Sequence, residues 1–284
     1  GLIKIGITGS YGKTTTKHIL NVLLSKKYSV CMTPHSFNTP MGLTKVVIKY
    51  LKKENQILIA EMGARNVGDI KYLCDLINPK HAIITAVASQ HLATFGSLDN
   101  IAKTKNELVH AITDGYVVFN AQSQGALNLY EKCDKEKYLS GINCNNAFCN
   151  IENIKATATG SEFDLIIDGE KINCKTKLIG EQFIEDIAMA SAMAYKLGVS
   201  LKEIADGIST LKPMAHRMEL VNNNNALTII DNSYNSSVES SKASLKTISM
   251  FNGNKIIITP GIVEMGAKEY EVNVDFGKNI AEVC

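Results

Sequence analysis

A lysine and three threonines follow two glycines in the stretch GSYGKTTT, residues 9–16. Gly9 and Gly12 permit backbone angles that point successive N–H groups at one spot, and such a spot binds phosphate when it lies at the positive end of a helix. Lys13 can reach the outer phosphates of a nucleotide, and the Thr14 hydroxyl can ligate a magnesium ion. These residue types in this order predict a phosphate-binding turn.

The turn departs in one position from the strict phosphate-loop motif. That motif has four residues between its glycines, and here position 7 is Ile7, which leaves only G-x-x-G-K-T-T. A glycine-rich turn that binds no ligand is the alternative interpretation. The flanks favour a nucleotide, because an apolar β-branched run, LIKIGIT, precedes the turn and apolar residues at helical spacing follow Lys13.

Three further side chains lie where an α/β sheet presents its working groups, just past the carboxyl ends of strands. Glu61 directly follows the predicted strand in LIAEMGARNVGDI, so its carboxylate can complete a magnesium site with Thr14, although a solvated or helix-capping glutamate is the alternative. His91, in ASQHLATFGS, is either a ligand or a structural histidine. Lys105, in IAKTKNELV, lies on a predicted helix, where a lysine is usually a solvated charge.

Composition and charge exclude several classes of partner. The 284 residues carry a formal net charge of +2 with both signs interspersed, so no basic stripe predicts binding to nucleic acid. Seven cysteines without a C-x-x-C pair suit free thiols in a reducing compartment. No apolar run approaches the length of a membrane span. We expect a cytoplasmic protein with no nucleic-acid partner and no membrane span.

Hydrophobic patterning predicts two α/β units. Strand and helix patterns alternate over residues 1–110, which predicts a parallel sheet with helices on both faces. Short alternating strands over residues 116–179 predict a β-rich insertion or layer, and two amphipathic helices follow. Beyond KPMAHRMEL we expect a second unit with strand ALTIIDNS, helix SSKASLKTISMF and strand KIIITPG. The chain opens on a core strand and stops inside a helical pattern, so we expect further domains at both ends.

Five segments resemble the Mur ligase family in their order and spacing, and most closely its MurF branch. They span nearly the full chain: TGSYGKTTT, EMGARNVGDI, HLATFGSLDNIAKTKNEL, HRMEL and DNSYNS. The resemblance implies an ATP-dependent amide ligase of peptidoglycan precursor synthesis. In that reaction a substrate carboxylate attacks the γ-phosphate of ATP, an acyl phosphate forms, and an incoming amine displaces phosphate. The implied substrates are a UDP-MurNAc-peptide-like molecule and an amino acid or dipeptide.

The resemblance also implies an α/β fold and its division into domains. A P-loop parallel-sheet ATPase domain with the β-rich layer would span residues 1–216, as the central ATP-binding domain of the family. Residues 217–284 would form the first part of a truncated, Rossmann-like α/β C-terminal domain, and the N-terminal substrate domain would be absent from this chain. The segment SFNTPMGL, residues 36–43, lies where the family meets its sugar-nucleotide substrate.

Site residues are carried over from the family position by position. Thr14 and Glu61 would hold a first magnesium ion, and His91 with a carbamylated Lys105 would support a second. A carbamate turns the lysine cation into an anion, and metal ions would screen the negative charges that converge during the attack. The catalytic residues so implied are Lys13, His91 and Lys105. The residues implied to contact ATP are Gly9, Ser10, Gly12, Lys13, Thr14, Thr15, Arg217, Asp231 and Asn235.

The chain departs from the family pattern at the start of one helix. The family usually has His-Asn-x-x-Asn there, with asparagines that contact adenine, and this sequence has Gln182, Phe183 and Asp186. Two alternatives stay open: a ligase that adds amino acids to another carboxylate, as folylpolyglutamate and cyanophycin synthetases do, and a nucleotide-binding module without ligase chemistry. EMGA and HLATFGS favour the MurF branch over the first. The presence of Lys13, Glu61, His91 and Lys105 argues against the second, whereas the departures at residues 182–186 argue for it.

Overall fold

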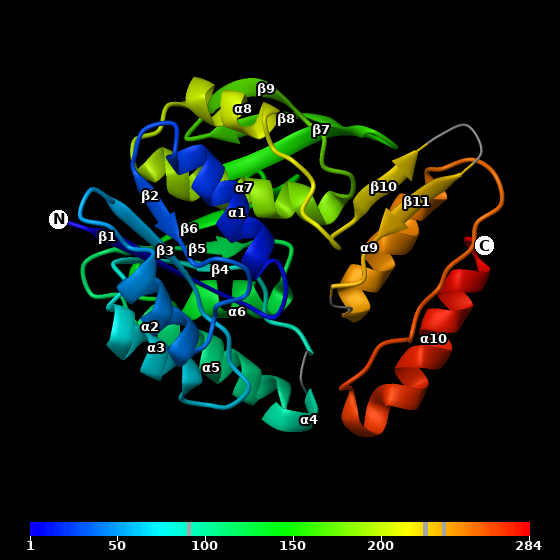
Figure 1. The fold of residues 1–284 in the computed structure, drawn as a ribbon, viewed down its shortest axis with the longest axis horizontal. Helices are drawn as coiled ribbons and strands as arrows, with labels where there is room; N and C mark the ends of the chain where they lie inside the picture. Colours follow the sequence, from blue (N-terminus) through cyan, green and yellow to red (C-terminus); the bar gives the residue numbers. More distant parts are fainter. Residues whose placement is uncertain (90–91, 224–226, 235–236) are drawn as a thin grey trace.

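The computed structural model describes residues 1–89, 92–223, 227–234 and 237–284 (Figure 1). A nine-stranded sheet with strand order β2-β3-β1-β4-β5-β6-β7-β8-β9 forms the centre of the larger unit. Neighbouring strands are parallel from β2 to β7 and antiparallel from β7 to β9. The strands of this sheet are β1 (Ile3–Thr8), β2 (Val30–Met32), β3 (Ile57–Glu61), β4 (His81–Ile84), β5 (Tyr116–Asn120), β6 (Glu136–Ile142), β7 (Cys149–Thr157), β8 (Gly160–Ile167) and β9 (Glu170–Thr176).

The predicted parallel sheet is confirmed, and the region expected as a β-rich insertion or layer is the far half of the same sheet. β5 and β6 extend its parallel part, and the meander from β7 to β9 completes it. The expectation of short strands throughout residues 116–179 is wrong in one respect, because α6 (Gln124–Lys132) joins β5 to β6. A helical crossover of this kind lets β6 run parallel to β5, since a tight hairpin would reverse the chain.

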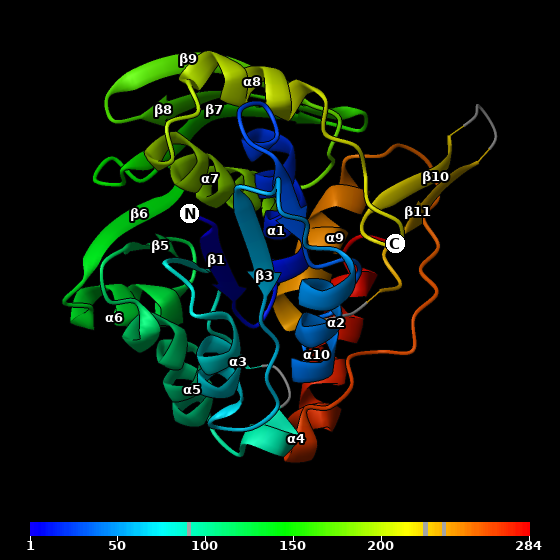
Figure 2. The same cartoon turned by 60° about the vertical axis from the view of Figure 1, so that its left-hand side comes forward.

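Helices cover both faces of the sheet (Figures 1 and 2). α1, α7 and α8 pack on one face around a core that includes Leu20 and Ile187, while α2, α3, α5 and α6 pack on the other around Leu73 and Leu108. Successive residues of β3 alternate between the two cores, as the pleat of a strand requires. The remaining helix bounds of this unit are α1 (Lys13–Leu24), α2 (Pro40–Lys49), α3 (Asp69–Ile77), α4 (Leu92–Phe95), α5 (Leu98–Ala111), α7 (Glu181–Lys196) and α8 (Leu201–Ser209).

The sheet brings three strand ends together beside the predicted phosphate turn. β1 lies between β3 and β4, with Ile7 opposite Glu61 and Thr8 opposite Ile84. The carboxyl ends of parallel strands meet at one edge of a sheet, so the turn after β1 and the carboxylate that ends β3 are neighbours. Tertiary pairing therefore joins two segments that lie 47 residues apart in the chain.

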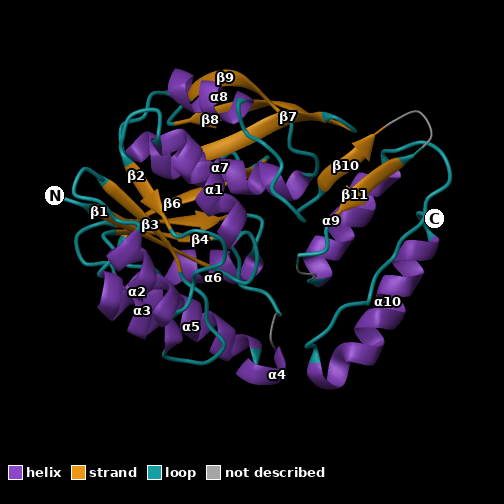
Figure 3. Ribbon diagram, viewed as in Figure 1, coloured by secondary structure: helices purple, strands orange, loops and turns teal. Residues whose placement is uncertain are grey.

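A smaller unit, which contains the last helix of the chain, lies beside the predicted phosphate turn between β1 and α1 (Figure 3). It contains the antiparallel hairpin of β10 (Glu219–Asn223) and β11 (Thr228–Asp231), helix α9 (Val238–Ser249), a 3-10 turn (Gly266–Lys268) and helix α10 (Glu269–Ala281). The predicted strand ALTIIDNS and helix SSKASLKTISMF are confirmed.

The strand expected in KIIITPG is wrong, because residues 255–261 form no strand. Two of its isoleucines are almost fully exposed, Ile256 at 87% and Ile258 at 97%. A β-branched run becomes a strand only where a neighbouring strand offers backbone partners, and among the described residues none lies beside this segment.

Two expectations concern cysteines and membranes. All seven cysteines are free thiols, as the absence of a paired spacing predicted. Within the described part of the chain, no helix has both the length and the apolar character needed to cross a bilayer.

Candidate active site

The turn between β1 and α1 takes its shape from two glycines. Gly12 has a φ of 80°, and a Cβ at this position would lie 2.6 Å from Oδ1 of Asp186. A Cβ on Gly9 would lie 2.7 Å from the backbone nitrogen of Ala86, which is closer than side chains approach. The Ser10 backbone N–H donates to the carbonyl of the same Ala86 at 2.8 Å. The backbone of the turn therefore lies directly against the segment after β4 and against α7.

Lys13 opens α1 and folds its amine back onto the turn. Its Nζ donates to the carbonyl oxygens of Gly9 at 2.7 Å and Ser10 at 3.1 Å. Burial lowers the pKa of Lys13, Glu61 opposes this shift, and the Arg217 guanidinium adds to it. An anion is a stronger partner for an ammonium group than neutral carbonyls are, so Lys13 can exchange these contacts for a phosphate.

Glu61 ends β3 with its carboxylate 1% exposed and fully hydrogen-bonded. Its Oε1 accepts from the Thr14 hydroxyl at 3.1 Å and from Nδ2 of Asn38 at 3.1 Å, and its Oε2 accepts from Nζ of Lys17 at 2.9 Å. Burial alone would raise the pKa of Glu61, but the nearby lysine cations hold it below its ordinary value. An ionised carboxylate and a hydroxyl that converge beside a phosphate turn are the oxygen donors magnesium prefers, so these residues fit the predicted metal pair.

Two residues of this cluster were not predicted from the sequence. Lys17 is fully buried and forms the ion pair with Glu61. The signal that could have indicated it is the four-residue spacing from Lys13, which puts both lysines on one side of a largely buried helix. Asn38 lies in the segment predicted to meet a substrate, but no pattern in the sequence assigned it to the carboxylate.

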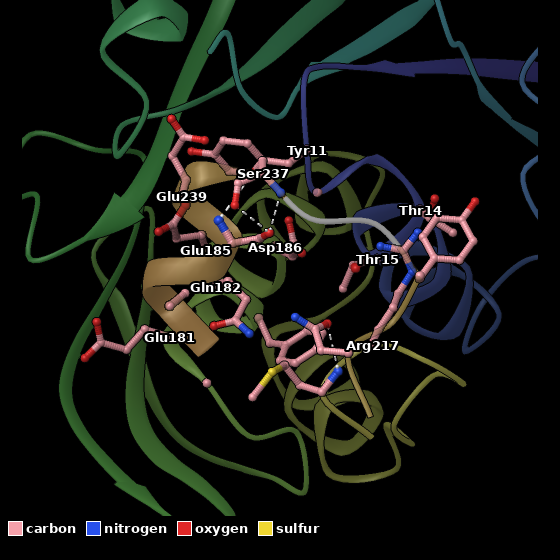
Figure 4. Close-up of a pocket in the computed structure, with 18 of the residues that line it drawn as sticks. Tyr11, Thr14, Thr15, Glu181, Gln182, Glu185, Asp186, Arg217, Ser237 and Glu239 are labelled. Atoms are coloured by element: carbon pink, nitrogen blue, oxygen red, sulfur yellow. Dashed lines mark hydrogen bonds between the residues drawn. The ribbon is translucent and has the colours of Figure 1, made fainter. Parts of the chain in front are cut away.

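Two cavities meet at the phosphate turn. The first, of about 320 Å³, is enclosed by the turn, the start of α7 and helix α9 (Figure 4). The second, of about 690 Å³, has Phe95, Tyr72 and Lys105 among its walls. Of the predicted site residues, those that line the first cavity are Ser10, Gly12, Lys13, Thr14, Thr15, Glu61 and Arg217, while Gly9 lines the second. Among the described residues, those that line both are Ser10, Lys13, Asn38 and Tyr234.

Lys105 lies in the second cavity rather than in solvent. It is 3% exposed, and its Nζ lies 5.9 Å from the centre of the Phe95 ring. Burial, with a further contribution from the Lys13 cation, lowers the pKa of Lys105 to about 7. The neighbouring Lys103 on the same helix is exposed. A large fraction of Lys105 is therefore neutral amine at neutral pH, which is the form that can react with carbon dioxide. His91, its predicted neighbour, lies outside the described residues.

The smaller unit contributes one predicted residue, Arg217, and one residue that was not predicted, Asn232, to the lining of the first cavity. Arg217 lines the first cavity with its guanidinium 4.0 Å from the centre of the Tyr234 ring. Asp231 is not among the described residues that line this cavity, and its Oδ2 pairs with Nδ1 of His216 at 2.7 Å. The adjacent Asn232 lines it instead. Asn235 lies outside the described residues, so its predicted contact stays a prediction.

The start of α7 forms the far end of the first cavity, as Figure 4 shows. Gln182 contributes a buried Oε1 that has no hydrogen-bond partner among the described residues. Asp186 accepts from the Thr16 hydroxyl at 2.9 Å, and burial raises the pKa of this carboxyl well above its ordinary value. An ion pair of 2.7 Å between Lys246 of α9 and Glu181 joins the two units at this end. The three positions that depart from the family pattern, Gln182, Phe183 and Asp186, thus all lie in one wall of the cavity.

Comparison with known proteins decides the family. The model of the Mur ligase middle domain matches residues 7–194. The chain belongs to the Mur ligase family. This Mur ligase is 29% identical over 280 residues to the UDP-N-acetylmuramoyl-tripeptide--D-alanyl-D-alanine ligase of Bacillus subtilis, which covers 98% of this chain and 60% of the relative. The resemblance expected from the five motifs is confirmed.

Solved structures agree with this assignment. A crystal structure of MurF from Acinetobacter baumannii superimposes on this chain with a TM-score of 0.92 at 26% identity. The superposition covers 99% of this chain and 61% of the Acinetobacter chain. A structure of MurF from Thermotoga maritima in complex with ADP gives a TM-score of 0.88 at 25% identity, covering 98% of this chain and 64% of the other. The chain thus spans about 60% of the length of the curated relatives it matches.

Proposed function

We propose that this chain is the nucleotide-using part of a MurF-type ligase. The protein would use ATP to join the carboxylate of a UDP-MurNAc-tripeptide-like substrate to the amine of a dipeptide such as D-alanyl-D-alanine, in peptidoglycan precursor synthesis. The relatives named above are ligases of this kind, and one neighbour was solved with ADP. The seven free thiols fit a reducing compartment such as the cytoplasm.

One observation carries the proposal: the two cavities share Lys13. The first cavity contains the phosphate turn and Glu61, and the second contains the buried Lys105. A nucleotide in the first and a carboxylate in the second would meet at the common wall, with the terminal phosphate next to the attacking oxygen. Holding two reactants in this way converts a bimolecular encounter into an intramolecular step.

Each residue of the wall has a role that its contacts support. The turn and Lys13 would bind the β- and γ-phosphates, and Thr14 with Glu61 would hold magnesium, which screens the negative charge of the phosphates. Lys105 would react as free amine with carbon dioxide, forming a carbamate N–C bond and releasing a proton. The carbamate would then support the second metal site expected with His91. Arg217 would approach the phosphates from the smaller unit.

The division of the chain supports the same proposal. We place the boundary between the ATP-binding domain, residues 1–216, and the following domain, residues 217–284, at a segment whose backbone is locally constrained. His216 and Met218 both have positive φ angles, 62° and 48°, and Met214 forms an isolated bridge with Arg217. A boundary here puts Arg217 where movement of the second domain would carry it toward or away from the nucleotide.

Phosphate release by the full-length protein tests the proposal. We expect ATP hydrolysis to ADP and phosphate only when both a UDP-MurNAc-tripeptide and D-alanyl-D-alanine are present, with formation of the joined product. Lys105→Ala should lose turnover and recover part of it with a small added carboxylic acid, whereas Lys103→Ala should stay active. Release that depends on a folate or another carboxylate instead would favour a ligase with a different acceptor. Nucleotide binding without release under any of these conditions would favour a non-catalytic module.

A further inference from the structure

The buried Lys17 lies behind the metal pair rather than in either cavity. It is 0% exposed and lines neither cavity, and its only charged partner in the described residues is Glu61, which is itself 1% exposed. Desolvation of two charges is costly, and one partner without the other would cost several kcal/mol. A fully buried pair next to a phosphate site therefore needs a reason beyond packing.

The two carboxylate oxygens of Glu61 accept hydrogen bonds from different groups of residues. Oε2 accepts from Lys17, which lines neither cavity, and Oε1 accepts from Thr14 and Asn38, which line the first cavity. Of the two oxygens, only Oε1 is therefore oriented toward the donors of the cavity.

A second hydrogen bond holds Lys17 in place, so its ammonium group cannot move with the Glu61 carboxylate if that carboxylate rotates. Its Nζ also donates to the carbonyl of His35, a residue held in the left-handed region with a φ of 46°. The backbone N–H of Glu61 donates to the Thr33 hydroxyl at 3.1 Å, which fixes the same loop to the end of β3. The ammonium group is thus fixed from two directions, by the carboxylate and by the loop of residues 33–38.

We propose that Lys17 makes this site select magnesium, by holding Oε2 of Glu61 so that only Oε1 can ligate a cation. Mg²⁺ is small, keeps octahedral geometry and takes a single oxygen from a carboxylate, whereas Ca²⁺ readily takes both oxygens. A carboxylate fixed for one-oxygen ligation penalises Ca²⁺ and leaves Mg²⁺ unaffected. The inference rests on the proposed nucleotide and metal site. Lys17 is a positioning residue here, since it acts through Glu61.

The affinity for ADP at saturating Mg²⁺ and at saturating Ca²⁺, measured by calorimetry on the full-length protein, tests this role. The readout is the ratio of the two dissociation constants, which separates cation choice from general loss of binding. For the unaltered protein we expect tighter binding with Mg²⁺. In Lys17→Met the preference should fall by about tenfold or more, because Glu61 can then offer both oxygens. Lys26→Met, an exposed lysine in the turn that follows the same helix, should keep the preference of the unaltered protein.

The possible outcomes separate this inference from the proposed function. If the unaltered protein binds ADP no better with Mg²⁺ than with a chelator, the proposed metal site fails and the role of Lys17 falls with it. If the unaltered protein prefers Mg²⁺ and Lys17→Met keeps the same ratio, the metal site stands and the role of Lys17 is overturned.

A second measurement needs no variant, and it decides the matter if Lys17→Met does not fold. A crystal structure of the unaltered protein with ADP and Ca²⁺ should show one oxygen of Glu61 on the cation and the other still on Lys17. Both oxygens on Ca²⁺ would overturn the proposal.

Discussion

The two ends of the first cavity are built differently. At the end of the cavity that carries the phosphate turn (the phosphate end), the Lys13 amine and the Glu61 carboxylate form hydrogen bonds of 2.7 to 3.1 Å. Their partners lie in the turn after β1, in α1 and in the loop before α2. At the opposite end of the cavity, formed by the start of α7 and called the base end below, the buried Oε1 of Gln182 has no hydrogen-bond partner among the described residues. The ion pair between Lys246 and Glu181 at this end is exposed. The ion pair at the phosphate end, between Lys17 and Glu61, is buried, whereas the ion pair at the base end, which joins the two units, is exposed.

The difference shows where binding energy can come from. Charge-assisted hydrogen bonds in a buried site contribute more than contacts on an exposed rim, because solvent screens the rim. Gly12, Lys13, Thr14 and Glu61 of the family motifs lie at the phosphate end, while three of the departures from the family pattern, Gln182, Phe183 and Asp186, lie at the base end. We infer that nucleotide affinity comes mainly from the phosphates, and the following substitutions are paired across the two ends to break or sharpen this inference.

Lys13→Ala should have the largest effect. The phosphates lose the cation that lies on the turn, and we expect affinity for ADP with Mg²⁺ to fall by about 100-fold or more, beyond detection in a standard titration. Lys246→Ala removes a lysine that lines the opposite end of the same cavity, and should change affinity less than about threefold. Calorimetry measures both. Equal losses in the two variants would remove the distinction between the ends.

Glu61→Gln should lower both metal dependence and stability. The variant leaves Lys17 buried without a counter-charge, so we expect the free energy of unfolding to fall by about 3 kcal/mol and ADP binding to lose its dependence on Mg²⁺. Glu181→Gln breaks the exposed pair at the base end and should cost less than about 1 kcal/mol. Denaturant unfolding and titration with and without a chelator provide the two readouts. A Glu61→Gln variant with unchanged Mg²⁺ dependence would exclude Glu61 as a ligand.

Lys105→Met should stabilise the protein in a pH-dependent way. Burial lowers the pKa of Lys105 in the folded state from 10.5 to about 7, so folding releases a proton between these values and the native protein is penalised most below pH 7. The penalty shrinks as pH rises from about 7 and is gone above about 10.5. The gain in melting temperature of Lys105→Met should therefore be larger at pH 6.5 than at pH 10, in bicarbonate-free buffer without nucleotide. Lys103→Met, which is exposed, should show no gain at either pH; a pH-independent gain for Lys105→Met would contradict the lowered pKa.

Gln182→Ala should have the smallest effect. Its buried Oε1 has no hydrogen-bond partner among the described residues, and one neutral hydrogen bond to a base contributes about 1 kcal/mol. We expect affinity for ADP to fall less than about fivefold. A loss of a hundredfold would show that the base end contributes as much as the phosphate end.

Sequence reasoning reached the phosphate end because local patterns specify it. Gly9, Gly12, Lys13 and Thr14 lie in one turn, and Glu61 follows a strand whose parallel pairing brings it alongside. Such features depend on neighbours in sequence or on a regular sheet, which periodicity predicts.

The remainder of the site depends on tertiary contacts that no local pattern encodes. In the sequence Lys17 is an ordinary helical lysine, and its pairing with Glu61 arises only because β3 places Glu61 beside α1. Asp231 is not among the described residues that line the cavity, and its carboxylate pairs with His216, 15 residues earlier in the chain. Residues 255–261 form no strand, because this segment pairs with no strand among the described residues. In each case the outcome depends on contacts with other parts of the chain, which the local sequence pattern does not show.

Competition between inorganic tripolyphosphate and ATP tests the central claim most directly. The compound carries the three phosphates without sugar or base, so it contacts the phosphate end alone. With Mg²⁺ present, we predict that tripolyphosphate displaces ATP from the full-length protein with an affinity within about tenfold of that of ATP, and that adenosine does not displace it. Displacement by adenosine and none by tripolyphosphate would contradict the account.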